Sequence, residues 1–500
     1  MSRYRAVAFR LAALLIGLSP LALLEAVLAV GGWGEPDPRV DPWVSFAAVR
    51  PLFELNTETG RYEIARGRQG YFRPDSFRAR KDPREFRVFV LGGSTVQGNP
   101  WGIETSFTSW LELNLRAADP QRDWDVINCG GISYASYRVV PILEEVLKYE
   151  PDLIVVYTGH NEFLEDREYA QVKRQASTLL WLVDQAARTR TFHWLRYSLL
   201  GQPRAGGNSR FNASEDEAWE SHAGDDRPQL PAEVAARLDF QGGLAKYHRD
   251  DAWREEVERH FEANLRRMAA LCHSAQVPLI LMNPVCNLRD CPPFKSEHRR
   301  GFSSEEQKRW DDLWSEARQR YAKDLPGAVE RLRQALAIDD QHGGIHYELA
   351  KCCDSLGQVE DARAHYELAR ELDVCPLRIR AAMNRSVLQV ADKTATPCVD
   401  ASALLSNACR DQIPGDYLLV DHVHPSIKGH QMLADALLDE MVRLHVVAPR
   451  EGWQVQRDQV FQSHLESLDS FYFLAGQRHL HALRNWAAGR ATRLPQQPAD

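Results

Sequence analysis

The feature that most limits the fold of this chain is a series of short, continuously apolar runs separated by stretches of helical periodicity. The runs, which we predict to be strands, are 86–91, 124–128, 152–158, 278–282 and 397–400. Helices are expected over 107–117, 137–149, 253–275 and 427–445. Strands that are apolar at nearly every position are typical of parallel sheets with both faces covered. We therefore expect an α/β fold with a three-layer α/β/α core around a parallel sheet.

A chain of 500 residues exceeds one average domain, so insertions or further modules are expected. The predicted division is an N-terminal anchor or signal segment over 1–30, a linker and N-terminal extension over 31–83, a first part of the core over 84–314 with an insertion at about 165–246, a helical insertion over 315–376, a second part of the core over 377–446, and a helical tail over 447–500.

The N-terminal segment has the pattern of an export signal. Three arginines open the chain, namely Arg3, Arg5 and Arg10. Residues 11–30 then contain no Lys or Arg, and twenty helical residues span roughly 30 Å, the thickness of the hydrocarbon layer. Pro20 and Glu25 weaken this pattern, and a signal peptide cleaved near Ala29 or a buried core helix are the alternatives. We expect a membrane-anchored protein with an extracytoplasmic body, secreted if the segment is cleaved.

The second insertion shows the spacing of a tetratricopeptide repeat. The positions that carry this spacing are Leu349, Ala350, Gly357, Ala362, Tyr366 and Ala369, with Ala328 and Ala335 in register thirty-four residues before Ala362 and Ala369. Small residues at this spacing let two antiparallel helices pack closely. One good and one degenerate repeat are predicted. They are expected either to bind a protein partner or substrate, or to pack on the core as a plain helical hairpin.

Charge and cysteine content exclude some functions. The formal net charge of −8 gives no basic excess to neutralise phosphates, so nucleic acid is not an expected partner. Nine cysteines leave at least one unpaired, and Cys286 and Cys291, which flank a short loop, are the expected local disulfide. No spacing repeats as a zinc site would require, so no metal is predicted.

Three polar motifs stand at or beyond strand ends and carry the candidate chemistry. Ser94 follows the first strand directly, where open α/β folds place their ligands. Asp421 and His424, three residues apart, can provide the base that a weak hydroxyl nucleophile needs and the group that orients that base. Asn161, after the third strand, can donate its amide to an oxyanion. Each motif alone is common in non-catalytic turns. His422 and His430 are expected to be structural.

In this order, the motifs resemble those of the SGNH/GDSL hydrolase superfamily. The resemblance covers about 84–166, 278–287 and 397–445. It implies that Ser94 is the nucleophile, with the backbone N–H of Ser94 in the oxyanion hole. It also implies that Asn161 donates to the oxyanion, and that Asp421 and His424 complete the triad.

The chain departs from the family's motifs at three positions. Gly93 replaces the Asp that usually precedes the nucleophile, and Glu162 replaces the Asp that usually follows the oxyanion Asn. In the second motif the usual oxyanion glycine falls on Ser133, with Gly130 and Gly131 as alternative donors. A backbone N–H is the donor in each case, so Ser133 can serve if its dihedral angles permit.

The resemblance implies an ester hydrolase that works through an acyl-enzyme without a cofactor. An N-terminal anchor with inserted tetratricopeptide-like units resembles a membrane-anchored bacterial branch of the superfamily. The expected substrate is an acylated small molecule or glycan of the cell envelope, bearing acetyl or other short acyl esters. Two alternatives stay open: an O-acyltransferase acting on envelope polysaccharide, and a non-catalytic scaffold that recruits a partner through the repeats.

Overall fold

The computed structural model describes residues 51–165 and 243–487, with short stretches between residues 19 and 33, 190 and 198, and 234 and 239. The chain forms two compact units, one of residues 1–48 and 167–230 and one of residues 49–166 and 231–500. In the first unit, the Glu25 carboxylate accepts hydrogen bonds from the backbone N–H groups of Arg190 and Thr191. The second unit contains every candidate site residue.

A five-stranded parallel sheet forms the centre of the second unit. Its strands are β4 (Glu85–Gly92), β5 (Asp123–Gly130), β6 (Leu153–Tyr157), β7 (Leu279–Met282) and β8 (Cys398–Val399). Their order is β5-β4-β6-β7-β8, so the chain leaves β4 to one side for β5 and then crosses to the other side for β6. Ligands of such sheets bind at this switch point, beyond the carboxyl ends of the strands. The predicted α/β class with a parallel sheet is confirmed.

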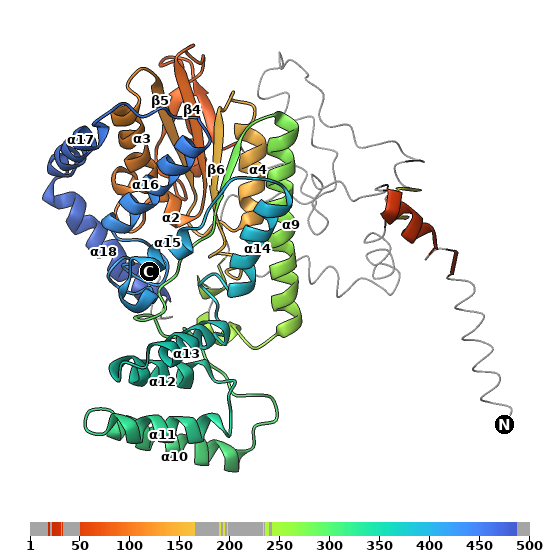
Figure 1. The fold of residues 1–500 in the computed structure, drawn as a ribbon, viewed down its shortest axis with the longest axis vertical. Helices are drawn as coiled ribbons and strands as arrows, with labels where there is room; N and C mark the ends of the chain where they lie inside the picture. The colour runs from red at the N-terminus through yellow and green to blue at the C-terminus, as the bar shows by residue number, and fades with distance from the viewer. Residues whose placement is uncertain are drawn as a thin grey trace, which may run out of the picture. The chain divides into compact units, whose positions relative to one another are not determined.

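Two groups of helices cover the sheet, because alternate strand residues point to opposite faces. One face, which includes Val88 and Val90, packs on α3 (Phe107–Ala118) and α16 (Ile427–Arg443), and α17 (Trp453–Ser467) packs against α3 on the outer side. The other, which includes Phe89 and Leu91, packs on α4 (Ser136–Val146), α9 (Asp251–Ala275) and α14 (Ala381–Lys393). Figure 1 shows the two groups on either side of the strands. The shorter helices are α2 (Ser94–Gln97), α15 (Ala401–Asn407), and the 3-10 turns Arg66–Arg68, Ile103–Thr105, Arg237–Asp239, Gly243–Lys246 and Arg410–Gln412.

Part of the stretch expected to be a linker, 31–83, is folded. Strands β1 (Phe53–Asn56), β2 (Arg61–Ile64) and β3 (Ser76–Arg78) form an antiparallel sheet. The Phe53 and Phe77 rings pack edge-on against Phe89 of β4. This stretch therefore extends the hydrophobic core. Residues 34–50 lie outside the described residues.

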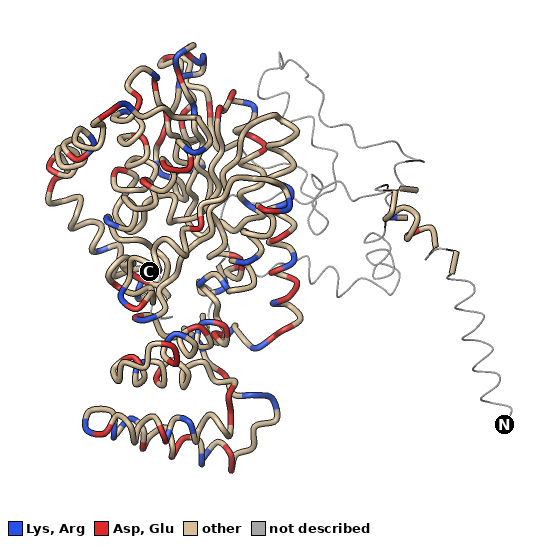
Figure 2. The backbone as a smooth tube through the Cα atoms, in the orientation of Figure 1, with Lys and Arg blue, Asp and Glu red and all other residues tan. Residues whose placement is uncertain are grey.

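Four helices form the helical insertion as two antiparallel hairpins. They are α10 (Ser304–Arg320), α11 (Leu325–Leu336), α12 (Gly343–Ser355) and α13 (Val359–Glu371). The alanines predicted to allow close packing, Ala328, Ala335, Ala350, Ala362 and Ala369, are all buried. The insertion begins at residue 304, earlier than the predicted 315, because Ser303 and Glu306 form a capping box that starts α10. Figure 2 shows acidic and basic residues interleaved along these helices.

The last described helix of the C-terminal tail is α18 (Ser470–Ala487), which returns to the carboxyl edge of the sheet. Tyr472 on this helix shares a 2.8 Å hydrogen bond with Thr105, and His479 lies 3.2 Å from the carbonyl of Pro100. Gly476 allows this approach, because a Cβ there would lie 1.9 Å from the Trp101 ring. The tail is thus packed against the loop that follows Ser94.

Two predictions concern residues that the structure describes only in part. Half of the expected anchor over 11–30, and most of the insertion at about 165–246, lie outside the described residues. Within the part of the chain that is described, no helix has both the length and the apolar character needed to cross a bilayer.

The predicted disulfide is absent, since all nine cysteines are free thiols. Cys286 and Cys291 are both buried but have separate partners. The Cys286 sulfur lies 4.0 Å from Nη1 of Arg370, and the Cys291 thiol donates to the carbonyl of Pro292 at 3.5 Å. The short loop between them therefore does not bring the two sulfurs into a covalent pair.

Candidate active site

Ser94 lies at the carboxyl edge of the sheet, as the first residue of the short helix α2. The two glycines before it allow close approach of neighbouring groups. A Cβ on Gly92 would lie 2.0 Å from the Tyr157 carbonyl oxygen, and one on Gly93 would lie 2.6 Å from the Asn161 amide nitrogen. Gly98 closes the turn with φ of 94°, in the left-handed region that favours glycine. The Ser94 side chain is therefore presented at the switch point of the sheet.

His424 lies between Ser94 and Asp421, within hydrogen-bond distance of both. Its Nε2 is 2.8 Å from Ser94 Oγ, and its Nδ1 is 2.7 Å from Asp421 Oδ2. Because the carboxylate can only accept, the Nδ1 of a neutral imidazole carries the proton and Nε2 presents a lone pair to the serine hydroxyl. The structure thus brings together the three residues predicted as a triad, although 327 positions separate Ser94 from Asp421 in the sequence.

The turn that carries these two residues is fixed by its own backbone. Asp421 Oδ1 accepts the backbone N–H groups of Val423 at 2.9 Å and His424 at 2.8 Å. Val420 donates to the carbonyl of His424 at 2.8 Å, and Ser426 caps α16 directly afterwards. The spacing of three residues therefore lets one carboxylate hold both the backbone and the ring of the histidine.

Burial and charge keep the Asp421 carboxylate ionised. Asp421 is 6% exposed and His424 2% exposed. Burial favours the neutral acid, but the adjacent His424 and His422 and the hydrogen bonds from His424 outweigh it and hold the pKa of Asp421 well below its usual range. A buried anion in this position stabilises an imidazolium at His424.

Two donors of the predicted oxyanion hole lie at the ends of neighbouring strands. Ser94 is the first residue of α2, so its backbone N–H has no acceptor within the helix. The Asn161 amide donates one hydrogen to the Tyr134 carbonyl at 3.0 Å, which fixes its orientation and leaves its second hydrogen to donate. Both side chains are partly exposed, as a group that meets substrate must be.

Hydrogen bonding distinguishes among the alternatives for the third donor. Gly130 N–H already donates to the Asn128 side chain at 2.9 Å, and Gly131 N–H donates to the Gly92 carbonyl at 3.0 Å. Ser133 N–H makes no hydrogen bond within the described part of the chain. Ser133 also adopts a φ of 63°, which is uncommon for serine and found mostly where structure or function requires it. Ser133 is therefore the better candidate of the three.

Glu162, which replaces the family's usual Asp, has a structural role. Its carboxylate accepts the backbone N–H of Ser136 at 2.6 Å and the Ser136 hydroxyl at 3.0 Å. Ser136 begins α4, so the acid caps the N-terminus of that helix, where negative charge is favourable. The longer side chain thus supports the helix that follows the Ser133 loop.

The other histidines near the site are buried and neutral. Burial lowers the pKa of His160 and of His430 to about 3, and that of His422 to about 4. His160 Nδ1 accepts the Ile379 N–H at 3.2 Å, and His430 Nδ1 accepts the N–H of Phe107 at 3.2 Å. The contact of His430 agrees with the structural role predicted for it, whereas His422 Nδ1 lies 3.6 Å from Asp421 Oδ1.

Sequence reasoning missed Asn287, which links the catalytic turn to the loop after β7. Its side-chain amide donates to the Asp421 carbonyl at 3.2 Å and to the Asp416 carboxylate at 2.8 Å, and its backbone N–H donates to the His422 carbonyl at 2.9 Å. Asn287 is 1% exposed. The only signal in the sequence is its position shortly after the strand 279–282, which is shared by several other polar residues.

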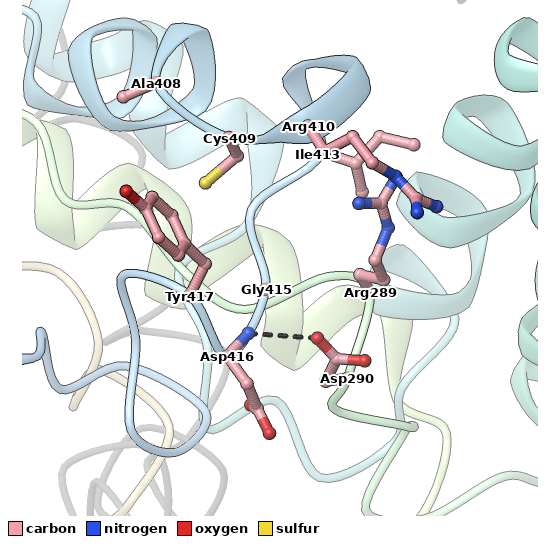
Figure 3. Close-up of a pocket in the computed structure, with 9 residues that line it drawn as sticks. All are labelled: Arg289, Asp290, Ala408, Cys409, Arg410, Ile413, Gly415, Asp416 and Tyr417. Atoms are coloured by element: carbon pink, nitrogen blue, oxygen red, sulfur yellow. Dashed lines mark hydrogen bonds between the residues drawn. The ribbon is translucent and has the colours of Figure 1, made fainter.

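A separate hollow of about 370 Å³ lies beyond Asn287, and Ser94 does not line it. Figure 3 shows its walls, with the Tyr417 ring facing the Cys409 thiol and the guanidinium groups of Arg289 and Arg410 on the far side. The Asp416 N–H donates to Asp290 across its floor at 2.9 Å. Both arginines pair with acidic side chains, so the hollow is a polar junction next to the helical hairpins.

Comparison with known proteins gives one match to a family model. A model described as the tetratricopeptide repeat matches residues 320–383. This segment is similar to tetratricopeptide repeats. The predicted repeats are confirmed, and the matched range runs from the end of α10 to the start of α14. A search of curated protein sequences found no match.

Several solved structures of esterases and hydrolases resemble the chain. A lipase/acylhydrolase from Enterococcus faecalis is 11% identical, with a TM-score of 0.31, covering 73% of this chain and 100% of that one. An acetylxylan esterase from Geobacillus stearothermophilus is 14% identical, with a TM-score of 0.30, covering 72% and 95%. An alpha/beta hydrolase from a metagenome of Lake Arreo, Spain, is 14% identical, with a TM-score of 0.28, covering 72% and 96%. All three TM-scores are below 0.5, so the geometry of the site, and not these similarities, is the basis for the function.

Proposed function

We propose that this protein is a serine ester hydrolase of the SGNH/GDSL type that removes short O-acyl groups from carbohydrate of the cell envelope. One observation carries the proposal. Asp421, His424 and Ser94 form a continuous chain of hydrogen bonds of 2.7 Å and 2.8 Å that ends at a partly exposed hydroxyl. A hydroxyl paired with an oriented base is the arrangement that activated serine nucleophiles require.

The reaction begins with attack of Ser94 Oγ on the ester carbonyl carbon while His424 Nε2 takes the hydroxyl proton. The tetrahedral oxygen accepts hydrogen bonds from the backbone N–H groups of Ser94 and Ser133 and from the Asn161 amide. His424 then donates its proton to the departing alcohol oxygen, and the carbon–oxygen bond breaks to leave an acyl-enzyme. Water attacks this ester with His424 again as the base, which releases the acid and restores Ser94.

The envelope setting is the part of the proposal that rests on sequence alone. The arginines before residue 11, followed by a stretch without Lys or Arg up to residue 30, support export with the body outside the cytoplasm. The tetratricopeptide-like segment, with two hairpins packed beside the loop 286–290, supports recruitment of a protein partner. The proposed substrate is an acylated glycan at the envelope.

The test uses purified full-length protein with p-nitrophenyl acetate and butyrate, compared with Ser94→Ala and His424→Ala. Loss of either group should lower kcat by at least about 10³-fold. His273→Ala, which changes an exposed histidine on α9, is the matched control and should retain full activity. If the folded parent hydrolyses no faster than the two variants, the proposal fails and the scaffold interpretation gains support. Acyl-enzyme that accumulates until a sugar acceptor is added would identify a transferase instead.

A further inference from the structure

Arg73 is a partly buried arginine without a partner. Its guanidinium makes no hydrogen bond or ion pair to any of the residues that the structure describes, and its Nε is fully buried. The nearest acid along the chain, Asp75, is engaged elsewhere: it accepts the backbone N–H groups of Asn128 at 2.8 Å and Ser76 at 2.7 Å. Buried charges are normally paired, so an unpaired one requires an explanation.

The backbone places Arg73 beside the candidate active site. Phe72 forms an antiparallel bridge with Gly131. The Tyr71 carbonyl accepts the N–H of Ile132 at 2.9 Å and the side-chain amide of Gln97 at 2.7 Å. The segment before Arg73 therefore contacts both the loop that carries Ser133 and the helix that begins at Ser94.

Helix α18 carries two side chains within electrostatic reach of Arg73. The guanidinium is close enough to Tyr472 and His479 for its charge to influence both side chains, and His479 is likewise influenced by His424 and Asp421. His479 Nδ1 donates to the Pro100 carbonyl at 3.2 Å, which leaves Nε2 as a hydrogen-bond acceptor. Arg73 is thus near the loop of the oxyanion hole along the backbone and within electrostatic reach of the C-terminal helix.

The loop after Ser94 adds polar groups that have no partner in the described structure. Gln97 and Asn99 are each 1% exposed. Gln97 Oε1, both side-chain polar atoms of Asn99, and the indole N–H of Trp101 are buried without a hydrogen bond. Burying such groups without partners is unfavourable. Gln97 ties this polar loop to the backbone two residues before Arg73, through the Tyr71 carbonyl.

We propose that Arg73, His479 and the Gln97–Trp101 loop form a subsite that binds the carboxylate-bearing sugar of the ester, so that the preferred substrate is an O-acylated acidic glycan. The Arg73 guanidinium pairs with the sugar carboxylate, and Nε2 of the partly exposed His479 accepts a hydrogen bond from a sugar hydroxyl. The subsite deepens the proposed function and rests on it, because it places the alcohol half of the ester next to Ser94. Arginine is suited to this role, because its planar guanidinium can donate two parallel hydrogen bonds to one carboxylate.

The first arm of the test compares two aryl acetates of matched reactivity. 4-Acetoxybenzoate carries a carboxylate on its leaving group, and 4-acetoxybenzamide is its neutral counterpart. Arg73→Gln should lower kcat/KM for the benzoate at least tenfold and change that for the benzamide less than twofold. Arg73→Lys should recover part of the loss. Arg66→Gln removes an equal charge from an exposed arginine nearby and should leave both values unchanged.

The second arm measures binding without chemistry. An oligogalacturonate and a neutral galactose oligomer are titrated calorimetrically into Ser94→Ala, with and without Arg73→Gln. The acidic oligomer should bind more tightly, and Arg73→Gln should abolish the difference. Equal losses of kcat/KM for both acetates in Arg73→Gln, or equal affinities for the acidic and the neutral oligomer, would overturn the subsite. If the parent hydrolyses neither acetate while Arg73 still selects the acidic oligomer, the esterase proposal fails and the subsite stands.

Discussion

Asp421 holds His424 through two separate hydrogen bonds, one to the ring and one to the backbone. Oδ2 faces Nδ1 at 2.7 Å, and Oδ1 accepts the backbone N–H of the same histidine at 2.8 Å. The carboxylate therefore sets the position of His424 and the tautomer of its ring at once. The predictions that follow separate these contributions from those of the surrounding residues.

Asp421→Asn should keep the fold of the turn and remove most of the activity. The amide oxygen can still accept the backbone N–H groups of Val423 and His424. Its NH2 group then faces the ring and favours the tautomer with the proton on Nε2, which cannot accept the Ser94 proton. We expect kcat for p-nitrophenyl acetate to fall by about 10³- to 10⁴-fold with an unchanged circular dichroism spectrum. An active variant would contradict the role assigned to Asp421.

Asn161→Ala should lower kcat with little change in KM. The amide is proposed to donate to the oxyanion, which forms only as the transition state is approached, so its loss removes about 10²- to 10³-fold in kcat. The variant also removes the hydrogen bond that the Asn161 amide donates to the Tyr134 carbonyl. Because this loss can lower stability, thermal unfolding should be measured alongside the kinetics. A rise in KM at constant kcat would instead assign Asn161 to binding of the substrate.

Asn287→Ala should reduce activity through the position of the catalytic turn. The substitution removes the hydrogen bonds to the Asp421 carbonyl and to Asp416. Asp416 is exposed and can be solvated, but the buried Asp421 carbonyl loses this donor, at about 1–3 kcal/mol. We expect kcat to fall about tenfold together with a lower melting temperature. Asp416→Ala, which removes only the outer of these two contacts, is the matched control and should have a much smaller effect on kcat.

The buried neutral histidines predict a specific dependence of stability on pH. Burial lowers the pKa of His430 from its ordinary value of 6.5 to about 3 in the folded protein. As pH falls from 7 to 5 the unfolded chain gains a proton there and the folded chain does not, so stability is lost over this range. This single group contributes roughly 2 kcal/mol to that loss.

Comparison of His430→Asn with the parent isolates this effect. The asparagine oxygen can accept the Phe107 N–H, but it does not titrate. Buried carboxyls with a raised pKa, such as Asp75 at about 6, oppose the effect equally in both proteins. Urea titrations give the free energy of unfolding of each protein, and the quantity compared is the value for the parent minus the value for His430→Asn. This difference should be roughly 2 kcal/mol smaller at pH 5 than at pH 7. The same difference at both pH values would contradict a neutral, buried His430.

The strands and the polar residues at their ends were predictable because both depend on local pattern. Continuous apolar runs identified all five strands of the parallel sheet, and β4 and β6 are neighbours whose ends bring Ser94 and Asn161 together. His424 lies far away in the sequence. Its approach to Ser94 was anticipated through the resemblance to a family, since no local pattern encodes a contact across more than three hundred residues.

The features that were not predicted depend on long-range packing. Strands β1 to β3 are only three or four residues long, too short for a clear alternation of polar and apolar positions. Arg73 and Asn287 acquire their significance from contacts with distant loops. The docking of α18 depends on Gly476 meeting Trp101, and a single glycine within a helix gives no indication of its partner.

The most direct test of the central claim, that Ser94 is an activated nucleophile, is covalent labelling with a fluorophosphonate followed by peptide mass spectrometry. The account predicts rapid stoichiometric modification of the parent on the peptide that contains Ser94, none in Ser94→Ala, and labelling of His424→Ala slowed by at least about 10³-fold. Labelling at another residue, or equal rates in the parent and in His424→Ala, would contradict it.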